Sequence, residues 1–164
     1  MSLRPDSASH EGRSPGDRFV CFLLGDQELA LPIHAVRETI RLRPITRVFL
    51  TPSWLVGIFG LRGEIVPAID LAPWLGMSRT SVGPESRLIV LRQRSRVLAI
   101  LADALAELRV MDGATLSSAP RTLSAEQSAL VTAVASTPTG TVRVLDPDAL
   151  FASDRLRELE THAA

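Results

Sequence analysis

The side chains that could perform chemistry are few and lie far apart in the sequence. The chain has three histidines, and since His10 and His162 lie near its ends, His34 is the one left in the body of the chain. A hydrolase triad needs a nucleophile, a base aligned with it and an acid that orients the base, and the sequence has no GxSxG nucleophile elbow. His34 is better explained as a partly buried or surface imidazole. The pattern gives little support to nucleophilic catalysis.

The sequence also has few of the residues and motifs that bind metals or cofactors. Structural zinc needs four Cys or His ligands and catalytic zinc about three, whereas Cys21 is the single cysteine. Cys21 lies in an alternating apolar run, which predicts an inert core thiol. Gly57, Gly60 and Gly63 are spaced three apart, unlike the dinucleotide fingerprint. All 18 basic residues are Arg, which excludes a phosphate-loop lysine and Schiff-base chemistry. We expect no metal and no cofactor.

The composition indicates a small globular protein and argues against nucleic acid or a membrane as its partner. With 164 residues, 46% of them hydrophobic, the chain can form one domain or two small lobes that share a core. Its formal net charge is zero and it has no Tyr and no Lys, so a basic groove with stacking platforms for nucleic acid is not expected. No window approaches the roughly 20 apolar residues that span a bilayer, which argues against membrane insertion. Residues 1–16 have no apolar signal segment, predict a disordered leader and favour a cytoplasmic protein.

Alternating apolar runs predict about nine or ten short strands with turns every eight to twelve residues. They cover residues 19–24, 27–31, 36–42, 55–61, 64–71, 87–91, 96–102, 105–111, 131–136 and 141–145. Thr51-Pro52 predicts a short turn of helix, Ser124 to Gln127 a capping box, and Asp146-Pro147 the start of a terminal helix that carries Leu150, Leu156 and Leu159 along one face. The spacing favours an all-β fold without alternating β/α units.

The most distinctive candidate site is the bend at Leu61-Arg62-Gly63. Gly63 can take the positive φ that a tight hairpin often demands. Arg62 is thereby held at the hairpin tip, where its guanidinium can bind a carboxylate through two parallel hydrogen bonds. Glu38, on the strand 36–42, is the preferred partner.

The two strands next to this bend support further predictions. Val36 and Ile40 share the strand face of Glu38 and predict an apolar patch with one charged member. Pro67 lacks the N–H that a sheet ladder needs, so its strand is expected to be an edge strand or to carry a bulge there.

This stretch resembles the CheW family, whose hallmark reads roughly G-x-x-N-L-R-G-x-I-V-P-x-x-D-L. The chain supplies, in register, Gly57, Leu61, Arg62, Gly63, Ile65, Val66, Pro67, Asp70 and Leu71. Further similarity lies in Ala30 to Ile33, Pro44 to Val48, Leu98 to Asp103 and Val142 to Asp146, so the resemblance covers about residues 17–153. The chain then divides into a leader (1–16), a CheW-like domain (17–153) and a C-terminal helix or tail (154–164).

The resemblance implies two intertwined five-stranded SH3-like β-barrels with short helices and a hydrophobic seam. It implies no enzymatic activity and no cofactor. Proteins of this family bridge the cytoplasmic tips of chemoreceptors to the regulatory domain of a CheA-type histidine kinase, within receptor arrays. The resemblance therefore implies a scaffold or adapter in chemotaxis-like signal transduction.

The resemblance also implies roles for individual residues. Four match family positions that affect receptor coupling: Val36, Glu38, Gly57 and Arg62. Each has a structural alternative: Val36 as core, Gly57 as a site of close strand packing, and Glu38 with Arg62 as an ion pair that stabilises the scaffold. A second group is expected to shape the hairpin: Leu61, Gly63, Pro67 and Asp70.

Departures from the family pattern leave alternatives open. Gly60 replaces the hallmark Asn, and Ala99, Ala104 and Ala133 stand where family members have glycine. A glycine lost from a positive-φ site costs about 1 kcal/mol or more, so local geometry is expected to differ there. The alternative is a divergent protein that binds only receptor or only kinase in another chemosensory system. A small-molecule-binding barrel would need a deep pocket with convergent polar groups, which the sequence does not supply.

Overall fold

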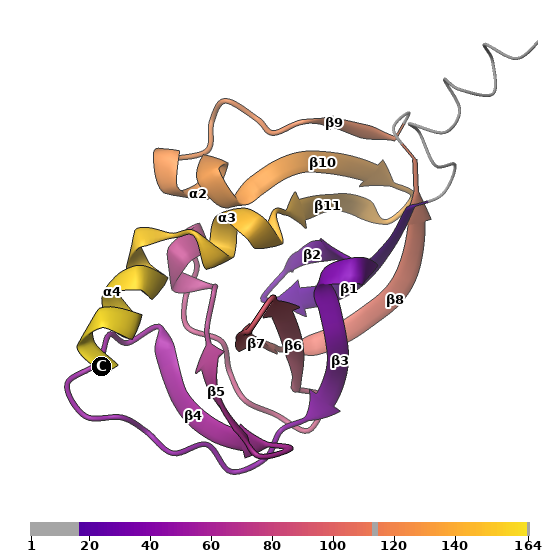
Figure 1. The fold of residues 1–164 in the computed structure, drawn as a ribbon. Coiled ribbons are helices and arrows are strands. Elements are labelled where there is room, and N and C mark those ends of the chain that lie inside the picture. The colour runs from indigo at the N-terminus through magenta and orange to yellow at the C-terminus, as the bar shows by residue number, and fades with distance from the viewer. Residues whose placement is uncertain (1–16, 113–114, 164) are drawn as a thin grey trace, which may run out of the picture.

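The computed structural model describes residues 17–112 and 115–163, with side chains as far as residue 160. Two β-sheets and a group of short helices make up these residues (Figure 1). The predicted leader, residues 1–16, lies outside the described residues. The all-β class predicted from the sequence is confirmed.

The first sheet is built from both ends of the chain. Its order is β8-β1-β2-β11-β10-β9, and β2 and β11 run parallel while its other neighbours run antiparallel. The strands are β1 (Asp17–Leu24), β2 (Gln27–Pro32), β8 (Ala104–Met111), β9 (Leu116–Ser118), β10 (Val131–Thr137) and β11 (Gly140–Leu145). This sheet has six strands where five were expected, because the short and mostly polar β9 gave no alternating signal in the sequence.

The second sheet is one continuous insertion between β2 and β8. Its order is β3-β6-β7-β5-β4, with β5 and β7 parallel. The strands are β3 (Val36–Arg41), β4 (Leu55–Leu61), β5 (Glu64–Ile69), β6 (Arg87–Gln93) and β7 (Arg96–Ala102). The first sheet is therefore completed only by strands from both sides of this insertion, whereas the second sheet takes all its strands from within it.

The three α-helices of the described residues gather on one side of the molecule (Figure 1). They are α2 (Ala125–Leu130), α3 (Pro147–Phe151) and α4 (Asp154–Ala163), and two 3-10 turns, η1 (Ile33–Ala35) and η2 (Pro73–Leu75), lie elsewhere in the chain. The predicted capping box is confirmed in both directions: the Gln127 backbone N–H donates to Ser124, and the Ser124 N–H donates to the Gln127 side chain. No helix among the described residues is both long and apolar enough to cross a membrane.

Two helix predictions need correction. The expected terminal helix is divided into two helices: α3 ends at Phe151 and α4 begins at Asp154. Residues 51–54 form a turn and no helix: the Leu55 N–H donates to the Pro52 carbonyl at 3.1 Å. The Thr51 hydroxyl does not cap a helix, because it donates backward to the Val48 carbonyl at 2.7 Å.

The two sheets share the largest hydrophobic core, which confirms the expected seam between them. It includes Phe22 and Leu24 from the first sheet, Ile89 and Ile100 from the second, and Leu156 from α4. Fully burying side chains of this size stabilises a fold by about 1.5–3 kcal/mol each. Each sheet also has a smaller core of its own. The shared core therefore fixes the position of the second sheet and of the hairpin that it presents.

Candidate protein-binding surface

The β4–β5 hairpin presents Arg62 at its tip. Leu61 pairs with Glu64 across a two-residue turn, and both central residues have positive φ, 50° at Arg62 and 82° at Gly63. Positive φ at both places is the pattern of a type I′ turn, which matches the twist of the flanking strands. A Cβ at Gly63 would meet no atom within 4 Å, so its φ, and not lack of space, favours glycine. Leu61 is buried in the core of the second sheet and anchors the turn from below.

Arg62 forms the predicted ion pair with Glu38 of β3. The Arg62 side chain is 60% exposed and that of Glu38 is 20% exposed. Exposed ion pairs contribute about 0–1 kcal/mol to stability. The pair therefore acts mainly on orientation: Glu38 is held on the strand and directs a guanidinium that remains largely open to solvent.

The pair belongs to a longer row of alternating charges that sequence reasoning missed. Arg37 of β3 lies 3.9 Å from Glu38 and 3.1 Å from Glu64, and Arg92 of β6 lies 2.6 Å from Glu64. Hydrogen bonds from Arg92 and then Arg37 hold the pKa of Glu64 below its usual value. The row ties the β4–β5 tip to β3 and β6. Its members come from three separate segments, so no spacing in the sequence could have revealed it.

Val36 and Ile40 share the half-buried face of β3 with Glu38, as expected, but they do not form one apolar patch. Both are half-buried, and they pack against different cores: Val36 against the core shared by the sheets and Ile40 against the core of the second sheet. The register of β3 against β6 also shifts between Val36 and Glu38. The structural alternative for Val36, a packing role, therefore agrees with its contacts.

Gly57 is required by a close approach of two backbone segments. Its φ is 153°, and a Cβ there would collide with the Thr46 carbonyl oxygen and lie 2.7 Å from Ile45. Thr46 exchanges two backbone hydrogen bonds of 2.8 Å with Ile58. The connector between β3 and β4 therefore closes over β4 at this point. This contact agrees with the packing alternative for Gly57.

Pro67 lies within β5, and Asp70 follows directly after it. The expectation that Pro67 marks an edge strand is wrong, because β5 lies between β7 and β4. The missing N–H is tolerated since β7 pairs only with Ala68 and Ile69, just beyond Pro67, and the bulge lies in β4 between Leu55 and Gly57. Asp70 is buried and accepts hydrogen bonds from the Ala72 N–H and from the N–H and hydroxyl of Thr80.

The departures from the family pattern cause no backbone strain. The described non-glycine residues with positive φ are Leu50, Arg62 and Arg94, so Ala99, Ala104 and Ala133 occupy conformations that suit alanine. Gly60 is exposed with no atom within 4 Å of a built Cβ. Its carbonyl accepts a hydrogen bond of 2.9 Å from Arg43, a second anchor for the hairpin.

The other described residues offer few groups for metal binding or nucleophilic chemistry. No cluster of three or more His, Cys, Asp or Glu side chains in this part of the chain could hold a metal ion. Burial raises the pKa of the Cys21 thiol to about 12, so it stays protonated near neutral pH. This agrees with the prediction of an inert core thiol.

Comparisons with known proteins agree with the geometry over the whole domain. The model of the CheW-like domain matches residues 18–155. Protein FrzA of Myxococcus xanthus is 36% identical over 107 residues, which cover 65% of this chain and 67% of that protein. The probable chemotaxis protein CheW of Rhizobium etli is 29% identical over 150 residues, 91% of this chain and 94% of its own. The crystal structure of the scaffolding protein TtCheW from Thermoanaerobacter tengcongensis superposes with a TM-score of 0.75 at 26% identity, covering 85% of this chain and 95% of that one.

Proposed function

Because this chain belongs to the CheW-like domain family, we propose that it is a non-catalytic adapter that couples chemoreceptors to a CheA-type histidine kinase. The observation that carries the proposal is the family match, which spans both sheets and the core between them. Two rhizobial relatives, one named chemotaxis protein CheW and the other probable chemotaxis protein CheW, align over most of this chain. The adapter would act in the cytoplasm, beside the receptors.

The receptor-facing surface in this proposal is the β4–β5 tip. The Arg62 guanidinium supplies the contact, since more than half of its side chain is open to solvent. Glu38 is a positioning residue, because it is mostly covered and acts through Arg62. Gly57 and Val36 act indirectly, by packing that holds the connector and β3 in place. A guanidinium fixed in this way suits a carboxylate on the partner, which it can bind through two hydrogen bonds.

Reconstitution from purified components tests the proposal. The full chain is mixed with a cytoplasmic fragment of the cognate receptor and the regulatory domain of the cognate kinase, and complexes are separated by size-exclusion chromatography. If the chain is an adapter, we expect one peak that contains all three proteins. A complex with only one partner would favour the alternative of a divergent protein that binds only receptor or only kinase. Failure to bind either partner would contradict the proposal.

A matched pair of variants locates the receptor contact. Arg62→Ala is expected to weaken receptor binding about tenfold, and so to lower the amount of receptor in the complex, while the kinase domain stays bound. Arg94→Ala is the control, because Arg94 is also a turn arginine with positive φ, 58° against 50°. Circular dichroism of both variants reports whether the fold is kept.

A further inference from the structure

The connector between β3 and β4 (residues 42–54) carries the two most exposed large apolar side chains among the described residues. Phe49 is 93% exposed and Leu50 is 100% exposed. Single exposed apolar residues are common in soluble proteins, but here two consecutive ones stand clear of the surface. Trp54, at the end of the same connector, is buried and packs edge-on against Trp74 at 4.9 Å. The connector is therefore anchored at its base and apolar at its tip.

The backbone at this apolar pair adopts an unfavourable conformation. Leu50 has φ of 58°, a left-handed conformation that costs an L-residue about 1–2 kcal/mol and that Gly or Asn adopts more readily. The hydroxyl of Thr51 donates to the Val48 carbonyl at 2.7 Å and closes the turn around Leu50. A leucine here gains no burial within the chain. Both the exposure and the conformation are unfavourable for the chain alone, which points to a contact outside it.

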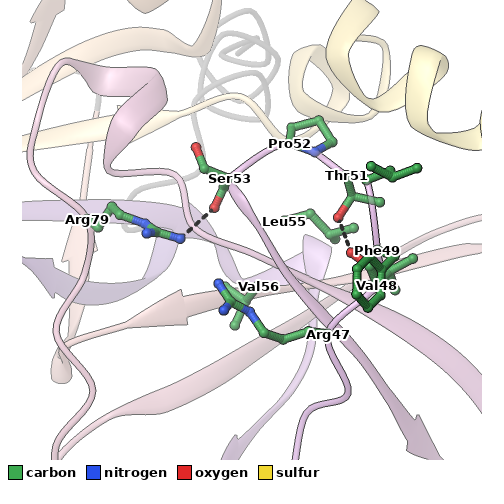
Figure 2. Close-up of a pocket in the computed structure, with 10 residues that line it drawn as sticks. Arg47, Val48, Phe49, Thr51, Pro52, Ser53, Leu55, Val56 and Arg79 are labelled. Carbon is green, nitrogen blue, oxygen red and sulfur yellow. Dashed lines mark hydrogen bonds between the residues drawn. The ribbon is translucent and has the colours of Figure 1, made fainter.

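Beside the pair lies a hollow of about 460 Å³. Figure 2 shows Arg79 and Ser53 along one side of it, Val48, Phe49 and Thr51 along the opposite side, and Leu55 and Val56 between them. The hollow is wide enough for an apolar side chain from a partner. Its walls combine an apolar floor with two cationic groups.

The charged side chains that line this hollow are all positive. Arg47 and Arg79 line it and no carboxylate does, and neither arginine forms an ion pair within the described residues, although Arg79 donates to the Ser53 carbonyl at 3.3 Å. Four other hollows of the described surface each contain an acidic side chain: Glu126 and Asp154, Glu158, Glu107, and Asp148. This hollow is therefore suited to a partner that brings its own carboxylates.

We propose that the Phe49–Leu50 tip and its hollow bind an acidic amphipathic helix of a partner protein. An added β-strand is disfavoured because Thr46 already occupies the edge of β4 at Ile58 with two hydrogen bonds, and helix-in-groove docking is the mode that apolar anchors beside a groove support. A lipid surface would contact the tip but would insert nothing into the hollow. The inference is independent of the adapter function, since it uses no residue of the Arg62 surface.

Cross-linking in the native cell tests which molecule covers the tip. The photoreactive analogue p-benzoylphenylalanine replaces Phe49, with the same analogue at Val82, another exposed apolar position, as the matched control. The expected adduct at position 49 is a protein segment with carboxylates spaced three or four residues apart beside apolar residues, and this adduct is absent at position 82. Adducts with lipid or with a second copy of this chain, adducts with a segment lacking acidic residues, or no adduct at all would overturn the proposal.

A binding measurement with the identified segment then tests the chemistry. The probe is a synthetic peptide that copies the cross-linked segment. We expect Leu50→Asn and the double variant Arg47→Glu with Arg79→Glu each to weaken binding about tenfold or more, and added salt to weaken binding to the wild type. Leu50→Asn tolerates the left-handed conformation, so its melting temperature is expected not to fall. Ile65→Ser, at an apolar residue that is 72% exposed and outside the hollow, is the control, and equal loss in this variant would contradict the proposal.

Discussion

Two hairpin turns of the second sheet place an arginine at positive φ, but they use it differently. In the β4–β5 turn the side chain of Arg62 pairs with Glu38 on β3. In the β6–β7 turn Arg94 has φ of 58°, and it is the residues on either side that bind: Gln93 bonds to Asp148 at 2.8 Å and Arg96 to Glu160 at 2.6 Å. The β6–β7 tip is thereby fastened to α3 and α4.

The difference shows that the turn backbone does not determine the role of its arginine. Both turns accept a residue that glycine would replace with less strain. At the β4–β5 tip a carboxylate on another strand fixes where the guanidinium lies, and at the β6–β7 tip no carboxylate among the described residues does so. We therefore propose Arg62 for the coupling role and use Arg94 as its control.

The largest effect is expected at the base of the β4–β5 hairpin. Gly57→Ala would place a Cβ against the Thr46 carbonyl and Ile45, so we expect a loss of about 2–4 kcal/mol from the combination of backbone strain and overpacking. Chemical denaturation measures the change in the free energy of unfolding. Gly60→Ala, three residues further along the same strand where a Cβ meets nothing, is expected to change stability by about 0.5 kcal/mol or less. Equal effects at both positions would show that the connector does not close on Gly57.

The next effect concerns binding at the two tips. Arg62→Ala is expected to weaken binding of the receptor fragment about tenfold, equivalent to about 1.4 kcal/mol, because it removes a charged contact. Arg94→Ala is expected to leave that affinity unchanged. Titration calorimetry with the receptor fragment measures both, and equal losses in the two variants would abolish the distinction between the tips.

A smaller effect separates backbone strain from side-chain bonding. Arg94→Gly is expected to raise the free energy of unfolding by up to about 1 kcal/mol, because glycine adopts positive φ without strain. Arg62→Gly gains the same relief but loses its ion pair with Glu38, so its net change is expected to be smaller. Thermal denaturation of the two variants side by side checks the order, and the reverse order would contradict it.

The smallest effect is a dependence on pH at the β4–β5 tip. Because its arginine partners lower the pKa of Glu64, the stabilisation from these pairs is fully present above the ordinary Glu pKa of about 4.3 and is lost as the pH falls through the lowered value. Carbon-detected NMR titration of the Glu64 carboxyl is expected to show a midpoint below the ordinary value. In Arg92→Ala the midpoint should rise, because the first contributor to the shift is removed, and an unchanged midpoint would contradict the assignment.

The sequence predicted the strands well because their apolar alternation is local. The same holds for the capping box at Ser124 and for the Arg62–Glu38 pair, which rests on a tip and a strand face that could each be recognised. The sequence predicted β5 itself but not its position inside the sheet, since that position depends on which strand pairs beside it. The missing N–H of Pro67 is harmless because β7 begins its pairing one residue later.

Other features that depend on contacts between distant segments were not predicted. Arg37, Glu64 and Arg92 meet only because β3, β5 and β6 are brought together. The connector that contains Phe49 and Leu50 was recognised, but an apolar pair in a connector predicts burial as readily as exposure. The short strand β9 is held by pairing with β10 and has no pattern of its own.

A charge swap at the β4–β5 tip tests most directly whether Arg62 is a contact or a brace. The double variant Glu38→Arg with Arg62→Glu keeps an ion pair between the two strands but removes the exposed cation from the tip. If the guanidinium contacts the receptor, the swapped protein folds normally by circular dichroism and binds the receptor fragment as weakly as Arg62→Ala does. Recovery of wild-type affinity in the swapped protein would mean that the pair only braces the hairpin, and the central claim would be wrong.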